Sequence, residues 1–145
     1  MVLVDTNILL YAVNRDSPNS ALALEAIETL MNGTEDWVLP WGIIYEFMRV
    51  VTHPRVFENP LTIRNACDLL EDWISSESCS VISDSDFHLQ EMKESIAEVS
   101  RISGNMLHDL HHAVNMREHG ITEILTADRD FLAFPWVRIR TLNGD

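Results

Sequence analysis

The chain has 145 residues, of which 46% are hydrophobic and 23% are charged, and 23 acidic against 10 basic residues give it a net charge of −13. This size predicts one globular domain over residues 1–145, and the charge argues against binding nucleic acid through a broad basic surface. No apolar run reaches the roughly 20 residues of a membrane span, and the N-terminus lacks the basic region of a signal peptide. Because Cys67 and Cys79 suggest neither a disulfide framework nor a metal-ligand spacing, we expect reduced thiols in a cytoplasmic protein with no membrane partner.

Apolar patterning in the first half of the chain predicts strands that alternate with helices. Residues 2–4 form a short buried strand, and a helix follows over residues 17–33, from an N-cap at Ser-Pro to a terminal glycine. A second strand over residues 37–39 leads into a helix over residues 41–52, which a His-Pro pair ends. A threonine caps a further helix over residues 62–73.

The same alternation continues in the second half. We expect a strand over residues 80–83 and a helix over residues 84–102. A helix over residues 106–119 then precedes a strand in residues 122–128 and a final strand in residues 136–142. Short apolar strands between amphipathic helices are typical of an α/β domain with a mainly parallel sheet.

Two carboxylates stand where predicted strands end. Asp5 directly follows the first strand, and Asp128 stands at the end of the strand in residues 122–128. Functional groups in parallel sheets collect outside the carboxyl ends of the strands. The two side chains are therefore candidates for one shared site.

Two more carboxylates lie at the margins of buried helical stripes. Glu46 is at helical spacing from Ile43 and Val50, and Asp109 is beside Ala113. Each acid alone has an ordinary structural explanation, as a helix cap, a turn residue or a boundary residue that reaches solvent. Converging together without a cation, the four would repel one another strongly. Mg²⁺ or Mn²⁺ removes that conflict, and the matching chemistry is phosphodiester hydrolysis.

Four segments supply these acids in chain order: "VDTNILLYAV", "YEFMRVVTHPRVF", "GNMLHDLHHAV" and "LTADRDFLAFP". Together they resemble the PIN-domain ribonucleases, specifically the VapC-type toxins of bacterial toxin–antitoxin pairs, over nearly the whole chain. The resemblance implies a PIN-like three-layer α/β/α fold with a central, mainly parallel sheet of four to five strands. It also implies a Mg²⁺- or Mn²⁺-dependent endoribonuclease that cuts tRNA, rRNA or mRNA. Such a toxin is expected to form a homodimer and to be neutralised by a cognate antitoxin whose tail covers the site.

The resemblance also assigns site residues by position. The acids that it assigns to catalysis and metal binding are Asp5, Glu46, Asp109 and Asp128, with Asp130 as an auxiliary metal ligand. The small polar residues that it assigns to orienting the carboxylates or the metal's water are Thr6 or Asn7, and Thr126. One departure concerns the packing around Asp109, because the family pattern has a small residue after the third acid. Here the small residue is delayed to Ala113.

Three histidines near the third acid suggest a zinc site. His108 and His112 are four residues apart, a spacing that zinc sites use, but the segment has no HExxH glutamate and no cysteine nearby. We therefore expect His108, His111 and His112 on the polar face of their helix, with RNA contact or proton transfer as the minor alternative.

Two arginines are candidates for RNA phosphate contacts. Arg15 follows the first acidic segment closely, and Arg129 lies within "ADRD". If Arg15 has this role, Arg15→Ala weakens RNA binding without disturbing metal binding.

Competing functions are weighed against the same residues. A haloacid-dehalogenase-type phosphatase needs a second aspartate two residues after Asp5, where this chain has Asn7, and a receiver-like module needs a late-strand lysine, whereas Lys93 is in a predicted helix. No G-x-S-x-G segment or activated Cys–His pair suggests covalent catalysis. The remaining alternative is a catalytically silent PIN-fold module that binds RNA or protein.

Overall fold

The computed structural model describes residues 1–144, and its centre is a five-stranded sheet within those residues. The strand order is β3-β2-β1-β4-β5, and every neighbouring pair is parallel. The strands are β1 (Val2–Val4), β2 (Trp37–Pro40), β3 (Cys79–Ile82), β4 (Glu123–Leu125) and β5 (Arg138–Arg140). The prediction of a mainly parallel sheet of four to five strands is confirmed.

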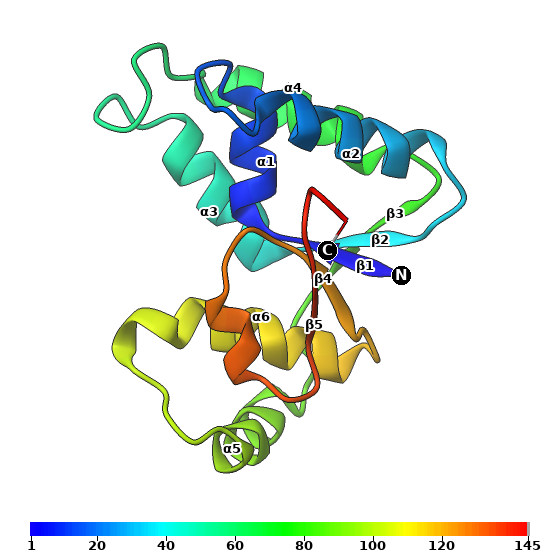
Figure 1. Cartoon of the computed structure of the whole chain (residues 1–145), viewed down its shortest axis with the longest axis vertical. Helices are drawn as coiled ribbons and strands as arrows, with labels where there is room; N and C mark the ends of the chain where they lie inside the picture. The colour runs from blue at the N-terminus through cyan, green and yellow to red at the C-terminus, as the bar shows by residue number, and fades with distance from the viewer. Residues whose placement is uncertain (145) are drawn as a thin grey trace.

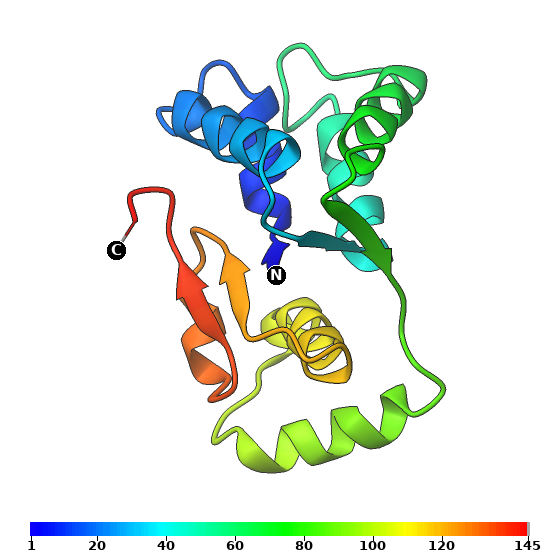
Figure 2. The ribbon, with the colours of Figure 1, turned by 90° about the vertical axis from the view of Figure 1, so that its right-hand side faces the viewer.

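Helices cover both faces of this sheet. The helices are α1 (Thr6–Val13), α2 (Ser20–Asn32), α3 (Trp41–Val51), α4 (Ile63–Ile74), α5 (His88–Glu98) and α6 (Leu107–Glu118), with short 3-10 turns η1 (Gly104–Met106) and η2 (Asp130–Ala133). Figures 1 and 2 place α1, α2 and α4 on one side of the sheet and α5 and α6 on the other. Helix α3 packs against α1, α4 and α6. The three-layer α/β/α prediction is confirmed.

The central strand β1 is buried from both sides. Val2, Leu3 and Val4 are all completely buried, as expected for a parallel strand with helices on both faces. Above the sheet, Phe47 of α3 packs on Trp73 of α4 with ring centroids 5.4 Å apart. The resulting core makes the strand ends a rigid platform for the side chains that follow them.

Three helices differ from what the sequence predicted. Helix α1 was not predicted, because "TNILLYAV" is apolar at nearly every position and shows no 3.6-residue period. Helix α2 begins at Ser20, three residues later than the predicted Ser-Pro start. Helix α5 covers only His88–Glu98 of the predicted residues 84–102, because Ser85 and its neighbours form a loop that contacts α6.

The cysteines and the helix lengths add two observations. Cys67 and Cys79 are free thiols, and burial raises the pKa of the Cys79 thiol to about 12, so it remains protonated. Within residues 1–144, none of the helices has both the length and the apolar character needed to cross a bilayer.

Candidate functional site

The site begins where β1 and β4 end. Val4 pairs with Leu125, so the residues that follow, Asp5 and Thr126, leave the sheet at the same edge. The Asp5 backbone N–H donates to the Leu125 carbonyl at 3.0 Å, which continues the ladder by one residue. Asp5 is only 7% exposed, so the carboxylate at this strand end is almost fully withdrawn from water.

Three neighbouring groups hold the Asp5 carboxylate in place. Its Oδ1 accepts a bond from the Thr6 backbone N–H at 2.7 Å, and its Oδ2 accepts bonds from Asn7 Nδ2 at 2.7 Å and Thr126 Oγ1 at 2.5 Å. Burial raises the pKa of Asp5, and the bonds from Thr126 and Thr6 oppose that rise without cancelling it. Thr6, Asn7 and Thr126, the predicted supporting residues, therefore all contact the first acid. Asp5 also caps α1, so its ordinary structural explanation is true as well.

Glu46 reaches the same place from α3. Its Oε2 accepts a hydrogen bond from Thr6 Oγ1 at 2.8 Å, because α1 and α3 pack side by side. The neighbouring His112 imidazole, and after it the Thr6 hydroxyl, lower the pKa of Glu46 to about 2. Glu46 is thus ionised at neutral pH beside an Asp5 carboxylate whose charge is disfavoured.

Three further carboxylates gather opposite. Oxygens of Asp109, Asp128 and Asp130 all lie within 4.8 Å of one another. Burial, and then the charges of Asp128 and Asp5, raise the pKa of Asp109 to about 6. Asp128 and Asp130 also organise their turn, since the Asp130 N–H donates to Asp128 Oδ1 at 2.8 Å. Asp130 is exposed.

These side chains surround a cleft of about 210 Å³. The residues lining it are Asp5, Thr6, Asn7, Leu10, Glu46, Val50, Asp109 and Asp128. All four principal acids of the sequence analysis are therefore brought together, and Asp130 adjoins them through Asp109 and Asp128. The donor set consists of carboxylate oxygens, with hydroxyl and amide groups behind them, and suits a hard divalent cation such as Mg²⁺ or Mn²⁺.

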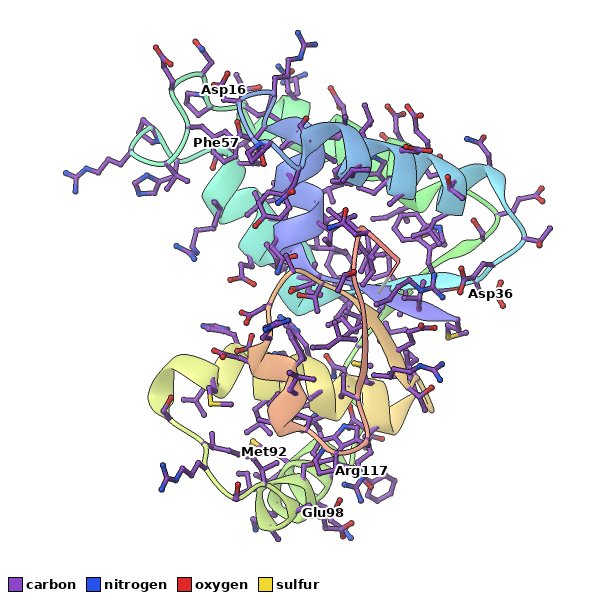
Figure 3. All side chains as sticks on the ribbon, in the orientation of Figure 1. Asp16, Asp36, Phe57, Met92, Glu98 and Arg117 are labelled. Atoms are coloured by element: carbon purple, nitrogen blue, oxygen red, sulfur yellow. The ribbon has the colours of Figure 1, made fainter. Side chains whose placement is uncertain are left out.

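The two candidate arginines differ in position. Arg129 is exposed and directly follows Asp128, at the start of η2. Arg15 is exposed beyond the far end of α1, whose eight residues separate it from Asp5 by roughly 12 Å. Arg15 lines a separate hollow with Asp16 and Phe57. Figure 3 shows Asp16 and Phe57 near each other, at the end of the molecule opposite Glu98.

The site contains one residue that the sequence analysis placed wrongly. His112 was expected on the polar face of its helix, but it is 2% exposed, and its Nε2 is 3.9 Å from Glu46 Oε2. Neither ring nitrogen has a hydrogen-bond partner within residues 1–144. His108 is exposed as predicted, and His111 is half-buried.

Gly42 of α3 explains how the imidazole fits. A Cβ atom at position 42 would lie 3.1 Å from His112 Cε1 and 3.3 Å from His111 Cε1, so a larger residue would crowd both rings. Glycine at position 42 therefore leaves room for the two rings. A glycine inside a predicted helix was the sequence signal for this close packing.

The fold is that of a PIN domain. The PIN domain family model matches residues 2–137, and the chain belongs to this family. It is similar to Ribonuclease VapC48 of Mycobacterium tuberculosis, with 30% identity over 136 residues that cover 94% of this chain and 93% of the relative. The resemblance to VapC-type proteins is therefore confirmed.

Solved structures agree on the fold. VapBC2 from Rickettsia felis, bound to a DNA fragment from its promoter, superposes with a TM-score of 0.69 at 17% identity, covering 97% of this chain and 98% of the other. Mycobacterium tuberculosis VapC20, a Sarcin-Ricin loop cleaving toxin, superposes with a TM-score of 0.66 at 18% identity, covering 95% and 99%.

Proposed function

We infer that the chain is a ribonuclease of the VapC type that acts as the toxin of a toxin–antitoxin pair. Its family and its similarity to proteins named VapC ribonucleases support this inference. We further propose that it is a metal-dependent endoribonuclease that hydrolyses phosphodiester bonds in tRNA, rRNA or mRNA. In this proposal residues 1–145 form one nuclease domain that works in the cytoplasm.

The observation that carries the proposal is the convergence of four acids on one cleft. Asp5, Glu46, Asp109 and Asp128 line it together, and burial, followed by the charges of Asp128 and Asp5, raises the pKa of Asp109 to about 6. A protein gains nothing in stability from such an arrangement unless a cation joins it. We assign these four residues to catalysis and to Mg²⁺ or Mn²⁺ binding, with Asp130 as an auxiliary ligand.

The chain's own residues would divide the work between them. When bound, the divalent ion activates water and stabilises charge on the scissile phosphate. Asp5 is held by three donors, so its orientation is set before any ligand arrives. Glu46 is ionised and is held through Oε2 by Thr6, which suits it to hold the cation.

Substrate and partners follow from the charge. Because the net charge of the chain is −13, we propose that RNA binding depends on the metal and on a few arginines. The arginines that we assign to phosphate contacts are Arg129, beside the cleft, and Arg15, farther along the bound RNA. The same acidity suits an antitoxin with a basic tail segment that enters the acid cluster. An antitoxin partner is consistent with the related chains solved as VapBC complexes, and we propose a homodimer from the family resemblance.

Cleavage of total cellular RNA by the purified, antitoxin-free protein tests the proposal. We expect discrete fragments with Mg²⁺ or Mn²⁺, and none with EDTA or with the Asp109→Ala variant. No cleavage by folded protein with either metal would refute the nuclease and favour the silent RNA- or protein-binding module. Growth arrest on expression, relieved by Asp5→Ala, separates the same two functions in cells.

A further inference from the structure

We propose that Asp84, His88 and His111 form a second metal site, which takes Zn²⁺ and is separate from the acidic cleft. Asp84 comes from the loop after β3, His88 is the first residue of α5, and His111 is in the middle of α6. This site was not anticipated from the sequence, where the spacing of His108 and His112 suggested a different zinc pair. It does not depend on RNA cleavage.

The ligand atoms of the three residues converge on one point. Asp84 Oδ1 is 2.7 Å from His111 Nε2 and 3.7 Å from His88 Nδ1, and all three atoms lie within 4.8 Å of one another. Tetrahedral zinc, with bonds of about 2.0–2.2 Å, needs ligand atoms about 3.3–3.6 Å apart. Movements of about 1 Å or less would therefore open the cluster to the ion.

The imidazoles of His88 and His111 meet edge to face beside the two carboxylates. Their ring centroids are 5.2 Å apart with planes at 82°, and His111 Nε2 contacts Asp84 Oδ1 while His88 Nδ1 lies between Asp84 Oδ1 and Glu118 Oε2. His88 is 20% exposed and His111 is 34% exposed, so an ion has access from solvent.

The surrounding residues supply a fourth ligand and support for the first three. Glu118 Oε2 is 2.9 Å from His88 Nδ1, and its side chain is only 2% exposed. Ser85 Oγ donates to Glu118 Oε1 at 2.6 Å, and Asn115 Nδ2 donates to Asp84 Oδ1 at 2.8 Å. Such outer hydrogen bonds orient the ligands of metal sites. Glu118 is the nearest group for the fourth position.

The chemistry of the donors separates this cluster from the acidic cleft. Two imidazole nitrogens with carboxylate oxygens suit Zn²⁺, whereas the all-oxygen cleft suits Mg²⁺ or Mn²⁺. A zinc ion at this site would link the loop after β3 and the start of α5 to α6, the helix that carries Asp109. Figures 1 and 2 show α5 stacked on the outside of α6.

Other contacts hold these helices without metal. Arg117, labelled near Glu98 in Figure 3, donates to Glu98 Oε1 at 2.8 Å and so joins α6 to α5. Removing one histidine should therefore leave the fold intact, which makes single variants usable.

Zinc titration calorimetry on the untagged, chelator-treated full chain tests the site, with saturating Mg²⁺ present to occupy the acidic cleft. We expect one Zn²⁺ per chain, with affinity reduced at least about tenfold in His88→Ala and in His111→Ala. The matched control His53→Ala changes a half-buried histidine outside the cluster and should bind zinc like the wild type. The visible spectrum of bound Co²⁺ should show four-coordinate geometry in the wild type and lose it in both cluster variants.

Three results would overturn the proposal: no zinc uptake by the wild type, unchanged uptake in both cluster variants, or uptake lost in Asp5→Ala instead. The first would leave the cluster as a hydrogen-bonded tie between α5 and α6, and the third would move the zinc to the acidic cleft. If circular dichroism shows that His88→Ala is unfolded, His88→Gln provides the measurement, because its amide can still donate to Glu118.

Discussion

Replacing Asp109 by asparagine should stabilise the metal-free protein while removing its metal binding. Asp109 is partly buried and faces the charges of Asp128 and Asp5, which help to raise its pKa from 3.8 to about 6. Its ionised form is therefore disfavoured in the folded chain relative to the unfolded one. Asparagine keeps the shape of the side chain and removes the charge.

The magnitude follows from the linkage between protonation and folding. Below pH 3.8 the Asp109 carboxyl is protonated in both the folded and the unfolded chain and does not change the stability. As the pH rises from 3.8 to about 6, the folded protein loses stability, and above about pH 6 the loss is constant. One pKa unit corresponds to about 1.4 kcal/mol, so the full difference is about 3 kcal/mol. Because Asp109 is only half-buried and solvent screens its charge, we expect about 1–1.5 kcal/mol, or a rise in Tm of about 3–5 °C.

Thermal melts by circular dichroism in EDTA check this at two pH values. Asp109→Asn should melt above the wild type at pH 7.5, and the difference should shrink at pH 4. Mg²⁺ should then raise the Tm of the wild type but not of the variant. The matched control Asp68→Asn, at an exposed aspartate on α4, should change neither. A variant that melts at or below the wild type in EDTA at pH 7.5 would refute the reasoning from carboxylate repulsion.

Three further changes test other contacts. Thr126→Val removes the buried hydroxyl that donates to Asp5 Oδ2. The free energy of unfolding in urea should fall by about 1–3 kcal/mol, and RNA cleavage should slow about 10–100-fold. Full activity of the variant would contradict the supporting role of Thr126. Glu35→Gln should lower the Tm at pH 7, because the hydrogen bonds from Arg140 lower the pKa of Glu35 from 4.5. The effect should fade in melts below pH 4.5, where protonation removes the pair's stabilisation, and an effect independent of pH would exclude this cause. Phe47→Ala leaves a cavity at a fully buried core position and should lower the free energy of unfolding by about 3–5 kcal/mol. Urea denaturation measures this loss, and the dependence of the free energy on urea concentration should not change. A loss below about 1 kcal/mol would mean that the core closes around the cavity.

Local patterns predicted most of the secondary structure because they are carried by neighbouring residues. The threonine expected to cap α4 does so, since Thr62 Oγ1 accepts a bond from the Asn65 N–H at 3.1 Å. Gly120, with φ of 66°, follows the end of α6, where glycine adopts the left-handed conformation at little cost. Helix α1 was missed because its run of apolar residues carries no period that distinguishes a helix from a buried strand.

Much of the acidic cleft could also be predicted from the sequence. Asp5 and Asp128 could be placed at strand ends by pattern alone, and Glu46 and Asp109 at the margins of helical stripes. The chain order of four short segments, each with its acid, then suggested the PIN-domain resemblance, which the family match bears out. The individual assignment of these residues to catalysis and metal binding remains a prediction.

The sequence by itself determined that this is an α/β protein with acids at the ends of its strands, because strand and helix periods are local properties. Only the tertiary structure decided which acids meet. The placement of β1 between β2 and β4 brings Asp5 to Thr126, 121 residues away. The packing of α3 on α6 buries His112 against Glu46, and the packing of α5 on α6 brings His88 to His111. These contacts join residues that no local period relates, so they follow from the order of the strands and the packing of the helices.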